Sequence, residues 1–336
     1  MGMVNFFTGV LLAVVSAGLG ATDCVLPERD LMGLPVSDAG PVEVEVHLYM
    51  SDLTEIDDAR QSFVADVFMR AQWRDPRLVH RGAQPCTVAD DAIWTPGLQV
   101  LNRRQLERIR APQLSVAADG TVTQAVRAYG DFTFRANLTD FPFDQQELHF
   151  ILVSVHGLQE VEITARQGTL GMGKVLSVAN WEVRFREGRP SEHFVTTQNR
   201  SVSRLDVIFD AKRLTGFYTW QLLVPLFLVV MMTWTVFWMP LEFVAPRVGL
   251  VATSMLTLIA YRFSMSSILP PIAYLTRLDQ FMVASSLLVF GALAAAVAVT
   301  YFEGKGQMAW ALRLNKASRA LAPALFLLVF VKVFIF

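Results

Sequence analysis

The chain has 336 residues, of which 53% are hydrophobic and 18% are charged, and its net charge is −1 at neutral pH. This composition is too apolar for an ordinary soluble protein, and it lacks the clustered basic surface of a nucleic-acid-binding protein. The charge is divided unevenly, with −6 in residues 1–215 and +5 in residues 216–336. We therefore expect an acidic soluble region followed by a basic membrane region, and no nucleic-acid partner.

The first 20 residues are predicted to be a signal peptide. An apolar stretch over 6–16 is followed by small residues at 18–20, which suit a signal peptidase. No Lys or Arg precedes the apolar stretch, so a short N-terminal membrane anchor is the alternative. Export places the next region in an oxidising compartment, where Cys24 and Cys86 either pair or remain separate, because the sequence does not give their distance.

Residues 41–213 are predicted to form β structure. Short runs with alternating apolar and polar residues, or with β-branched and aromatic enrichment, are separated by Gly, Pro and Asp turns. These runs lie at 42–46, 63–68, 132–134, 148–155, 161–164, 181–185 and 205–209. Many short strands at regular spacing indicate a β-sandwich, whereas the segment 105–118 has no clear assignment.

Four apolar segments follow, each near the roughly 20 residues that a helix needs to cross a bilayer. They cover 217–239, 247–269, 280–302 and 321–336, and the last is expected to begin before Pro323 because it is otherwise short. The loop before it carries the basic residues Lys305, Arg313, Lys316 and Arg319, as is typical of a cytoplasmic connection. Four spans then place both termini outside.

The second apolar segment has a face that recurs at steps of 4, 3, 4, 3 and 4, a sustained 3.5-residue period. This face, called the stripe below, reads Gly249, Thr253, Leu256, Ala260, Phe263 and Ser267. Polar rings hold water and apolar rings expel it, so this order suits a helix that lines a narrow aqueous pore. In the alternative, Leu256 and Phe263 are packing residues, and Thr257 and Ser264 face water.

Three motifs occur in a fixed order in the acidic region. They are Trp-Arg-Asp-Pro-Arg-Leu at 73–78, Ile-Trp-Thr-Pro-Gly-Leu at 93–98 and Phe-Pro-Phe-Asp-Gln-Gln at 141–146. In this order, and followed by four spans, they resemble the pentameric ligand-gated ion channels of the Cys-loop receptor superfamily. The likeness covers nearly the whole chain after the signal segment. Phe134 and Leu148 stand where animal members have their paired cysteines, so the chain is more similar to the prokaryotic branch.

The resemblance implies an α+β membrane protein that assembles as a homopentamer. Residues 21–215 would form an extracellular immunoglobulin-like β-sandwich, and residues 216–336 a four-helix transmembrane pore domain. A small-molecule ligand or protons would act between neighbouring sandwiches and open the pore to inorganic ions. The expected location is the cell (inner) membrane, in contact with lipid, with both the N-terminal domain and the C-terminus on the extracellular or periplasmic side. No cofactor is implied.

By the same resemblance, Asp57, Asp144 and Arg213 meet where the sandwich joins the helices, beside Pro270 in the loop between the second and third spans. A buried carboxylate–Arg pair at a moving interface can differ in strength between two states, as gating requires. The alternative is a static surface pair, which contributes little. We favour the coupling role.

The resemblance also marks an incomplete aromatic cage between subunits. The implied ligand-site residues are Phe68, Arg70, Tyr129, His156, Phe185 and Phe194. A complete cage holds an ammonium group by cation–π attraction, so a simple amine is disfavoured here. Trp94 and Trp181 are expected in the core. His156 and His193 titrate near neutral pH when unperturbed, which allows for proton sensitivity.

Ion selectivity is ambiguous in the sequence. Residues 245–249 contain Arg247 without an acid before it and look like the corresponding segment of animal chloride channels. The acidic outer region and Glu242 instead favour cations, and we expect a weak preference for cations. Arg262 lies off the stripe and is expected to pair with Asp279 or to reach headgroup water.

The sequence does not predict an enzyme. Its five histidines show no metal-ligand spacing, so no metal site is expected, and it has no nucleophile elbow or phosphate-binding loop. The main alternative to a channel is a membrane-tethered periplasmic binding or sensor protein that does not conduct ions. A transporter is a further alternative, although no inverted repeat is visible.

Overall fold

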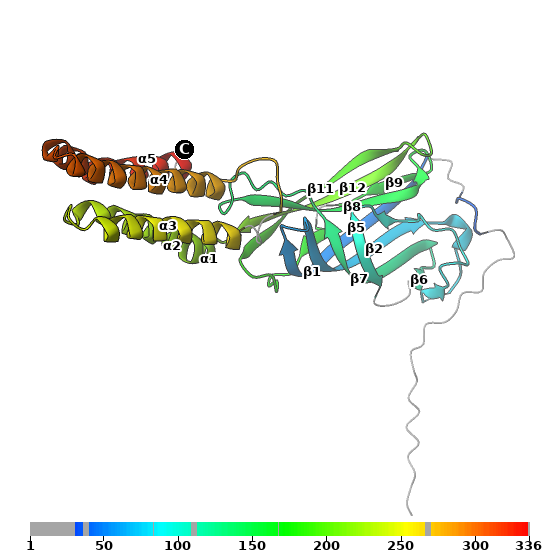
Figure 1. The fold of residues 1–336 in the computed structure, drawn as a ribbon. Helices are drawn as coiled ribbons and strands as arrows, with labels where there is room; N and C mark the ends of the chain where they lie inside the picture. The colour runs from blue at the N-terminus through cyan, green and yellow to red at the C-terminus, as the bar shows by residue number, and fades with distance from the viewer. Residues whose placement is uncertain are drawn as a thin grey trace, which may run out of the picture.

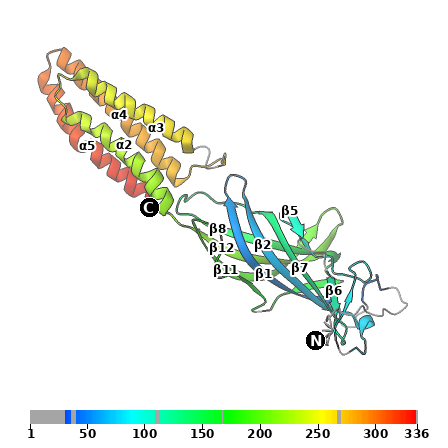
Figure 2. The ribbon, with the colours of Figure 1, turned by 90° about the horizontal axis from the view of Figure 1, so that it is seen from below.

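The computed structural model describes residues 31–35, 40–82, 84–108, 113–166, 168–265 and 270–334. They form two domains in chain order, a β-sandwich and a bundle of long helices that continues from one end of it (Figure 1, Figure 2). The predicted signal peptide, Cys24 and Ser267 lie outside the described residues. Cys86 takes part in a disulfide.

The larger sheet runs in the order β10–β1–β2–β7–β6–β3, with β5 paired to β7 and β9 paired to β1. Its strands are β1 (Val42–Asp57), β2 (Ser62–Arg74), β3 (Cys86–Val88), β5 (Arg103–Arg108), β6 (Gln113–Val116), β7 (Thr121–Thr133), β9 (Val161–Thr164) and β10 (Leu170–Met172). The other sheet runs β11–β12–β8–β4, with β4 (Gln99–Val100), β8 (Gln145–Gly157), β11 (Trp181–Val195) and β12 (Arg200–Arg213). The predicted sandwich is confirmed, and the unassigned segment 105–118 contains most of β5 and all of β6.

An aromatic cluster joins the two sheets. Phe63 and Phe132 come from the larger sheet and Phe150 and Phe209 from the smaller one, and all four side chains are fully buried. The Phe132 and Phe150 rings lie 4.7 Å apart in a T-shaped arrangement, and the Phe63 ring is 5.3 Å from that of Phe150. Such pairs add about 0.5–1.5 kcal/mol each beyond their buried area. Trp94 and Trp181 are also buried, as expected.

The described part of the helical domain contains four helices long and apolar enough to cross a membrane. The spans are Gly216–Trp238, Val244–Ser264, Arg277–Gly304 and Met308–Phe334. The first span is made of α1 (Gly216–Tyr218), the π-helical turn η2 (Thr219–Leu223), α2 (Val224–Trp234) and the 3₁₀ turn η3 (Thr235–Trp238). Pro225 is the second residue of α2, just after the π turn, where its missing N–H costs no helix hydrogen bond. The others are α3 (Val244–Met265), α4 (Arg277–Gly304) and α5 (Met308–Phe334).

The expectation that the fourth span begins before Pro323 is confirmed, but the expected basic loop is wrong. Helix α5 begins at Met308, so Arg313, Lys316 and Arg319 lie on the helix, and residues 305–307 alone connect it to α4. Residues 308–320 are rich in Ala, Leu, Arg and Lys, which favour helix strongly even where the segment is charged. Hydropathy therefore identified the apolar part of α5 and missed its polar first turns.

Candidate functional site

The stripe lies on the face of α3 that points away from its own bundle. Arg247, Val251, Ser254 and Leu258 are buried against the other helices. Each described stripe residue except Phe263 follows one of these by two positions, a rotation of about 200° around the helix. The exposed stripe members are Gly249, Thr253, Leu256, Ala260 and Phe263.

The large apolar members of the stripe are mostly exposed. Leu256 and Phe263 have exposed fractions of 67% and 73%, so most of each side chain lies outside the core of its own bundle. Thr257 and Ser264 are exposed too. The Thr253 hydroxyl donates to the Gly249 carbonyl at 2.9 Å, which satisfies its proton and leaves the oxygen able to accept from water.

The loop between β7 and β8 enters the end of the bundle nearest the sandwich. Its Leu138 and Phe141 are fully buried in the helical core rather than in the sandwich. At the start of α4, the backbone N–H of Arg277 donates to the Thr139 carbonyl at 3.0 Å, and that of Leu278 donates to the Phe141 carbonyl at 3.3 Å. The two domains therefore share a hydrogen-bonded junction, at the positions that the motif at 141–146 marks.

Arg213, the last residue of β12, is the centre of this junction. Its side chain is 1% exposed, and its Nε and Nη2 donate to the two oxygens of Asp144 at 2.8 and 3.0 Å. Its Nη2 also lies 2.8 Å from Oδ2 of Asp58, whose side chain is 9% exposed. One buried guanidinium thus joins two carboxylates from different loops of the sandwich, three residues before the first span begins.

Aromatic rings enclose the same guanidinium. The Arg213 Cζ atom lies 4.1 Å from the ring centroid of Trp181, 4.9 Å from that of Phe141 and 5.4 Å from that of Tyr218. Arg213 Nη1 donates to the Tyr218 hydroxyl at 3.1 Å. Faces of aromatic rings attract cations, especially where water is excluded. Tyr218 belongs to α1, so the sandwich and the first span both hold this charge.

The charges at the junction shift two pKa values. Burial lowers the pKa of Arg213, but the hydrogen bonds of Asp144 and the charges of Asp58 and Asp144 outweigh it and raise the pKa above its usual range. Burial raises the pKa of Asp58, and the nearby Asp144 raises it further, while Arg213 offsets only part of this effect. Asp58 therefore binds a proton more readily than an exposed Asp does.

The carboxylate that contacts Arg213 in the β1–β2 hairpin is Asp58, not the expected Asp57. Asp57 is the last residue of β1 and caps the turn, accepting from the backbone N–H of Arg60 at 2.8 Å and from its Nε at 2.7 Å. Asp58 follows β1 and turns inward. An Asp three residues before Arg60 is typical of a turn. This pattern assigns Asp57 to the turn, which makes Asp58 the carboxylate available to the junction. Pro270 is partly buried in the described part of the α3–α4 loop.

The expected partner of Arg262 has another role. Asp279 closes a capping box at the start of α4, where its Oδ2 accepts from the backbone N–H and the hydroxyl of Thr276. Arg262 is exposed on α3. The pairing with Asp279 is therefore wrong in this arrangement, because the helix terminus already uses that carboxylate.

The expected ligand residues separate into two groups in one subunit. Phe68, Arg70 and Tyr129 lie on β2 and β7 of the larger sheet, and Phe68 and Tyr129 are 40% and 42% exposed. The others are His156 on β8 and Phe185 and Phe194 on β11 of the smaller sheet. A single chain does not bring the two groups together, and a site that uses both requires a second subunit.

Several of these side chains already have partners. Arg70 Nη2 lies 3.2 Å from His47 Nε2. The ring of His156 is 5.1 Å from that of Trp94, and its Nε2 lies 3.1 Å from the Thr95 carbonyl. Phe185 packs on Phe209 at 5.6 Å. Phe194, with an exposed fraction of 56%, is the most exposed aromatic residue of the set.

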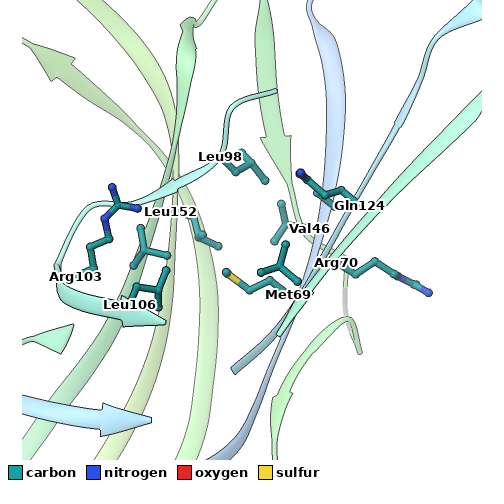
Figure 3. A pocket seen from close by; sticks show the side chains of 11 residues that line it. Val46, Met69, Arg70, Leu98, Arg103, Leu106, Gln124 and Leu152 are labelled. Carbon is teal, nitrogen blue, oxygen red and sulfur yellow. The ribbon is translucent and has the colours of Figure 1, made fainter. Parts of the chain in front are cut away.

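A cavity of about 60 Å³ lies between the two sheets (Figure 3). Its lining is mainly apolar, with Val46, Met69, Leu98, Leu106 and Leu152 around the space in Figure 3. Arg70 is at its edge, but the side chain points away from it. The sequence does not indicate this cavity, since the pattern of inward-facing apolar residues is the same whether their side chains fill a core or leave a gap. Among the described residues, no group of three His, Cys, Asp or Glu could hold a metal ion.

Comparisons with known proteins cover both domains. Residues 29–213 match the neurotransmitter-gated ion-channel ligand binding domain, and residues 222–329 match the neurotransmitter-gated ion-channel transmembrane region. A proton-gated ion channel of Gloeobacter violaceus is 24% identical over 299 residues, which are 88% of this chain and 82% of that protein. The gamma-aminobutyric acid receptor subunit beta-4 of Gallus gallus is 25% identical over 297 residues, 84% of this chain and 60% of the subunit. The chain thus spans less than two thirds of that longer relative.

Proposed function

The chain belongs to the neurotransmitter-gated ion-channel family, and we propose that five copies surround a central pore that opens when a stimulus acts on the outer domain. As a member of this family it is a multi-pass membrane protein with an extracellular ligand-binding domain, and it is not an enzyme. The proposed assembly is a homopentamer in the cell (inner) membrane. Its C-terminus lies outside, and the basic end of the bundle lies in the cytoplasm, in line with the positive-inside rule.

The observation that carries the pore proposal is the exposed stripe of α3. Leu256 and Phe263 are large, apolar and mostly exposed, opposite the buried face of the same helix. Around a fivefold axis these residues form apolar rings, with hydroxyl or small residues between them. We propose that Leu256 and Phe263 close the pore by excluding water, while Gly249 and Thr253 line its other half and Ser267 its mouth.

We propose protons as the first stimulus to test. A relative is named a proton-gated ion channel, and this chain has a carboxylate of raised pKa, Asp58, at the contact between the domains. Suppose that Asp58 is buried in one conformation, as in this structure, and exposed to water in another. The buried carboxylate binds a proton more tightly, so acidification shifts the equilibrium towards the conformation in which Asp58 is buried. Asp144, Arg213 and Pro270 complete the proposed coupling region.

A small-molecule ligand is the other proposed stimulus. The two groups of candidate residues, Phe68, Arg70 and Tyr129 on one sheet and His156, Phe185 and Phe194 on the other, would meet only across a subunit interface. Their exposed aromatic rings suit a molecule with an apolar face. The positions support this proposal by resemblance, and their geometry in one subunit is compatible with it.

We propose a preference for cations. Arg247 is 1% exposed and lies on the buried face of α3, so its charge does not project from the stripe. Glu242, just before α3, is exposed at the end of the bundle farthest from the sandwich. An acidic ring at a pore mouth attracts cations, and the acidic outer domain acts in the same direction.

Reconstitution of the full chain in liposomes tests the function. The variants Leu256→Ser and Leu287→Ser form a matched pair, because both leucines have an exposed fraction of 67% and lie in different spans, α3 and α4. We expect Leu256→Ser to raise the resting current by about tenfold or more, which corresponds to roughly 1.4 kcal/mol on the gating equilibrium. Leu287→Ser should behave like the original chain.

Three outcomes decide between the alternatives. A chain that assembles but passes no ions at any pH or with either variant supports the non-conducting sensor. Equal currents from both variants contradict the assignment of the stripe. A reversal potential near that of chloride in asymmetric salt contradicts cation preference and leaves an anion channel of the same family.

A further inference from the structure

A second buried arginine lies at the distal end of the bundle, defined here as the end farthest from the sandwich. Arg247, in the first turn of α3, donates from Nη2 to the Asn315 Oδ1 of α5 at 2.8 Å. Asn315 is 4% exposed and donates from Nδ2 to the Phe237 carbonyl of η3 at 2.9 Å. The amide thus links the pore-face helix to the first and fourth spans at one point.

Arg247 has more donors than this link uses. Its Nε and Nη1 atoms are buried and have no hydrogen-bond partner among the described residues. In the last turn of α4, the Oε2 atom of Glu303 is likewise buried without a partner in the described part of the chain. The charge of Glu303 acts attractively on the Arg247 guanidinium. Two opposite charges, each with a buried polar atom that lacks a hydrogen-bond partner among the described residues, therefore attract each other without a direct hydrogen bond.

A buried ion is tolerated when a counter-charge and hydrogen bonds compensate for the lost water, and this requirement is stricter inside a membrane. Of the acids described in the helical domain, Asp279 caps α4 at the opposite end and Glu242 is exposed. Glu303 is therefore the acid available to Arg247. Arg319 is the nearby cation, and its Nε instead donates to the Phe237 carbonyl at 2.7 Å.

We infer that Arg247 is a positioning residue, whose hydrogen bond to Asn315 and attraction to Glu303 fix the distal end of α3 to α5 and α4 and keep its charge out of the ion path. The inference rests on the proposed function, since it assigns the ion path to the stripe. It gives the segment 245–249 a structural role in place of the anion selectivity that its likeness to chloride channels implies. It also makes α5 a partner of α3 through one side chain.

The anchor has a consequence for gating. The junction contacts act on the sandwich end of the spans, whereas Arg247 holds the opposite end of α3 to two neighbours. A helix that is fixed at one end and displaced at the other tilts. The displacement then grows along the helix, from Gly249 through Leu256 to Phe263. Loosening the anchor should therefore change the gating equilibrium without changing which ions pass.

The experiment uses the full chain in liposomes, with the variants Arg247→Gln, Glu303→Gln and their combination. Each single change should shift the stimulus needed for half-activation by about tenfold, and the double variant should resemble the singles instead of adding their effects, because the pair is already broken. Arg247→Lys keeps the charge and should recover part of the shift. The reversal potential should stay unchanged in all four variants.

Gly249→Lys is the matched control, because it places a cation on the stripe two residues from Arg247. It should move the reversal potential towards that of chloride. If Arg247→Gln moves the reversal potential in the opposite direction by a similar amount, Arg247 faces the ion path and the inference is wrong. Independent, additive effects of the two single changes would contradict the pairing.

Thermal unfolding of the purified chain in detergent gives a test that does not need ion flow. The single variants should lower the unfolding temperature, and the double variant should lower it no further. If neither the original chain nor the stripe variant Leu256→Ser passes ions in liposomes, the proposed channel function is wrong. The unfolding result still decides whether Arg247 and Glu303 are paired.

Discussion

The two buried arginines of the subunit show how the two ends of the bundle differ. Every nitrogen of the Arg213 guanidinium has a partner, two carboxylates share its charge and three aromatic rings surround it. Arg247 makes one hydrogen bond through Nη2, and its other nitrogens are buried without partners among the described residues. The junction is thus a fully bonded contact between domains, whereas the distal anchor depends on a few groups inside one domain.

The comparison suggests different consequences for a single change. At the junction, many contacts hold the arginine. Replacing the arginine should therefore impair activation severely, whereas replacing one of its neighbours should impair it only mildly. At the distal anchor, Arg247 has few partners, so the loss of any one of them is not compensated by another contact.

Arg213→Gln should cause the largest loss. The substitution leaves Asp58 and Asp144 buried together without a cation, and breaking a buried pair in this way costs about 3–5 kcal/mol. We expect activation to be lost even where surface labelling shows that the protein reaches the membrane. Normal expression with normal activation would contradict a coupling role.

Arg60→Gln is the control for that prediction. Arg60 forms an exposed pair with Asp57 in the same hairpin that carries Asp58. Water and salt already screen such a pair, so little change in activation is expected. A loss comparable with that of Arg213→Gln would mean that Asp57, rather than Asp58, belongs to the coupling contact.

Asp58→Asn should flatten the pH dependence of activation. The raised pKa of Asp58 means that its charged form is lost as the pH falls through that pKa, and acid favours the arrangement that buries it. Asparagine cannot titrate and mimics the protonated side chain. Currents recorded over a range of pH should show a weaker slope, and an unchanged slope would remove Asp58 from proton sensing.

Asn315→Leu should have an intermediate effect. It removes the one hydrogen bond of the Arg247 guanidinium and a bond to the Phe237 carbonyl, and a hydrogen bond to a charged group contributes about 1.5–3 kcal/mol. A lower unfolding temperature and a shifted activation midpoint are expected. An effect no larger than that of Tyr218→Phe would show that the distal anchor has partners beyond those named.

Tyr218→Phe should have the smallest effect among the changes to the partners of the two buried arginines. It removes one hydrogen bond to Arg213 Nη1, while both carboxylates and the aromatic ring remain. The expected cost is about 1 kcal/mol or less, seen as a small shift in the activation midpoint. A complete loss of activation would mean that the hydroxyl itself transmits the signal to α1.

The sequence predicted the elements well where one physical signal dominated. Alternation identified the strands of the sandwich, and continuous hydropathy identified four spans. The start of α5 was missed because Arg313 and Lys316 lower the hydropathy of a segment that still favours helix. The short strands β5 and β6 were unassigned because their pattern is weak and long-range pairing with β7 stabilises them.

The candidate site shows a similar limit. The period of the stripe identified one face of α3 from sequence alone, and the structure places that face away from the bundle. The neighbouring residues Asp57 and Asp58 were not separated, although the Asp57–Arg60 turn signature assigns Asp57 to the turn and leaves Asp58 to point inward. The link from Arg247 to Asn315 joins positions 68 residues apart, and no local pattern indicates it.

Whether water reaches the exposed face of α3 decides whether this face lines a pore. Thr253→Cys and Leu287→Cys would be treated with a water-soluble thiol reagent before and during activation, in a chain whose Cys86 is already in a disulfide. We expect the reagent to block the current of Thr253→Cys during activation and to leave Leu287→Cys unaffected. Failure of Thr253→Cys to react in any state, in a channel that still conducts, would contradict it.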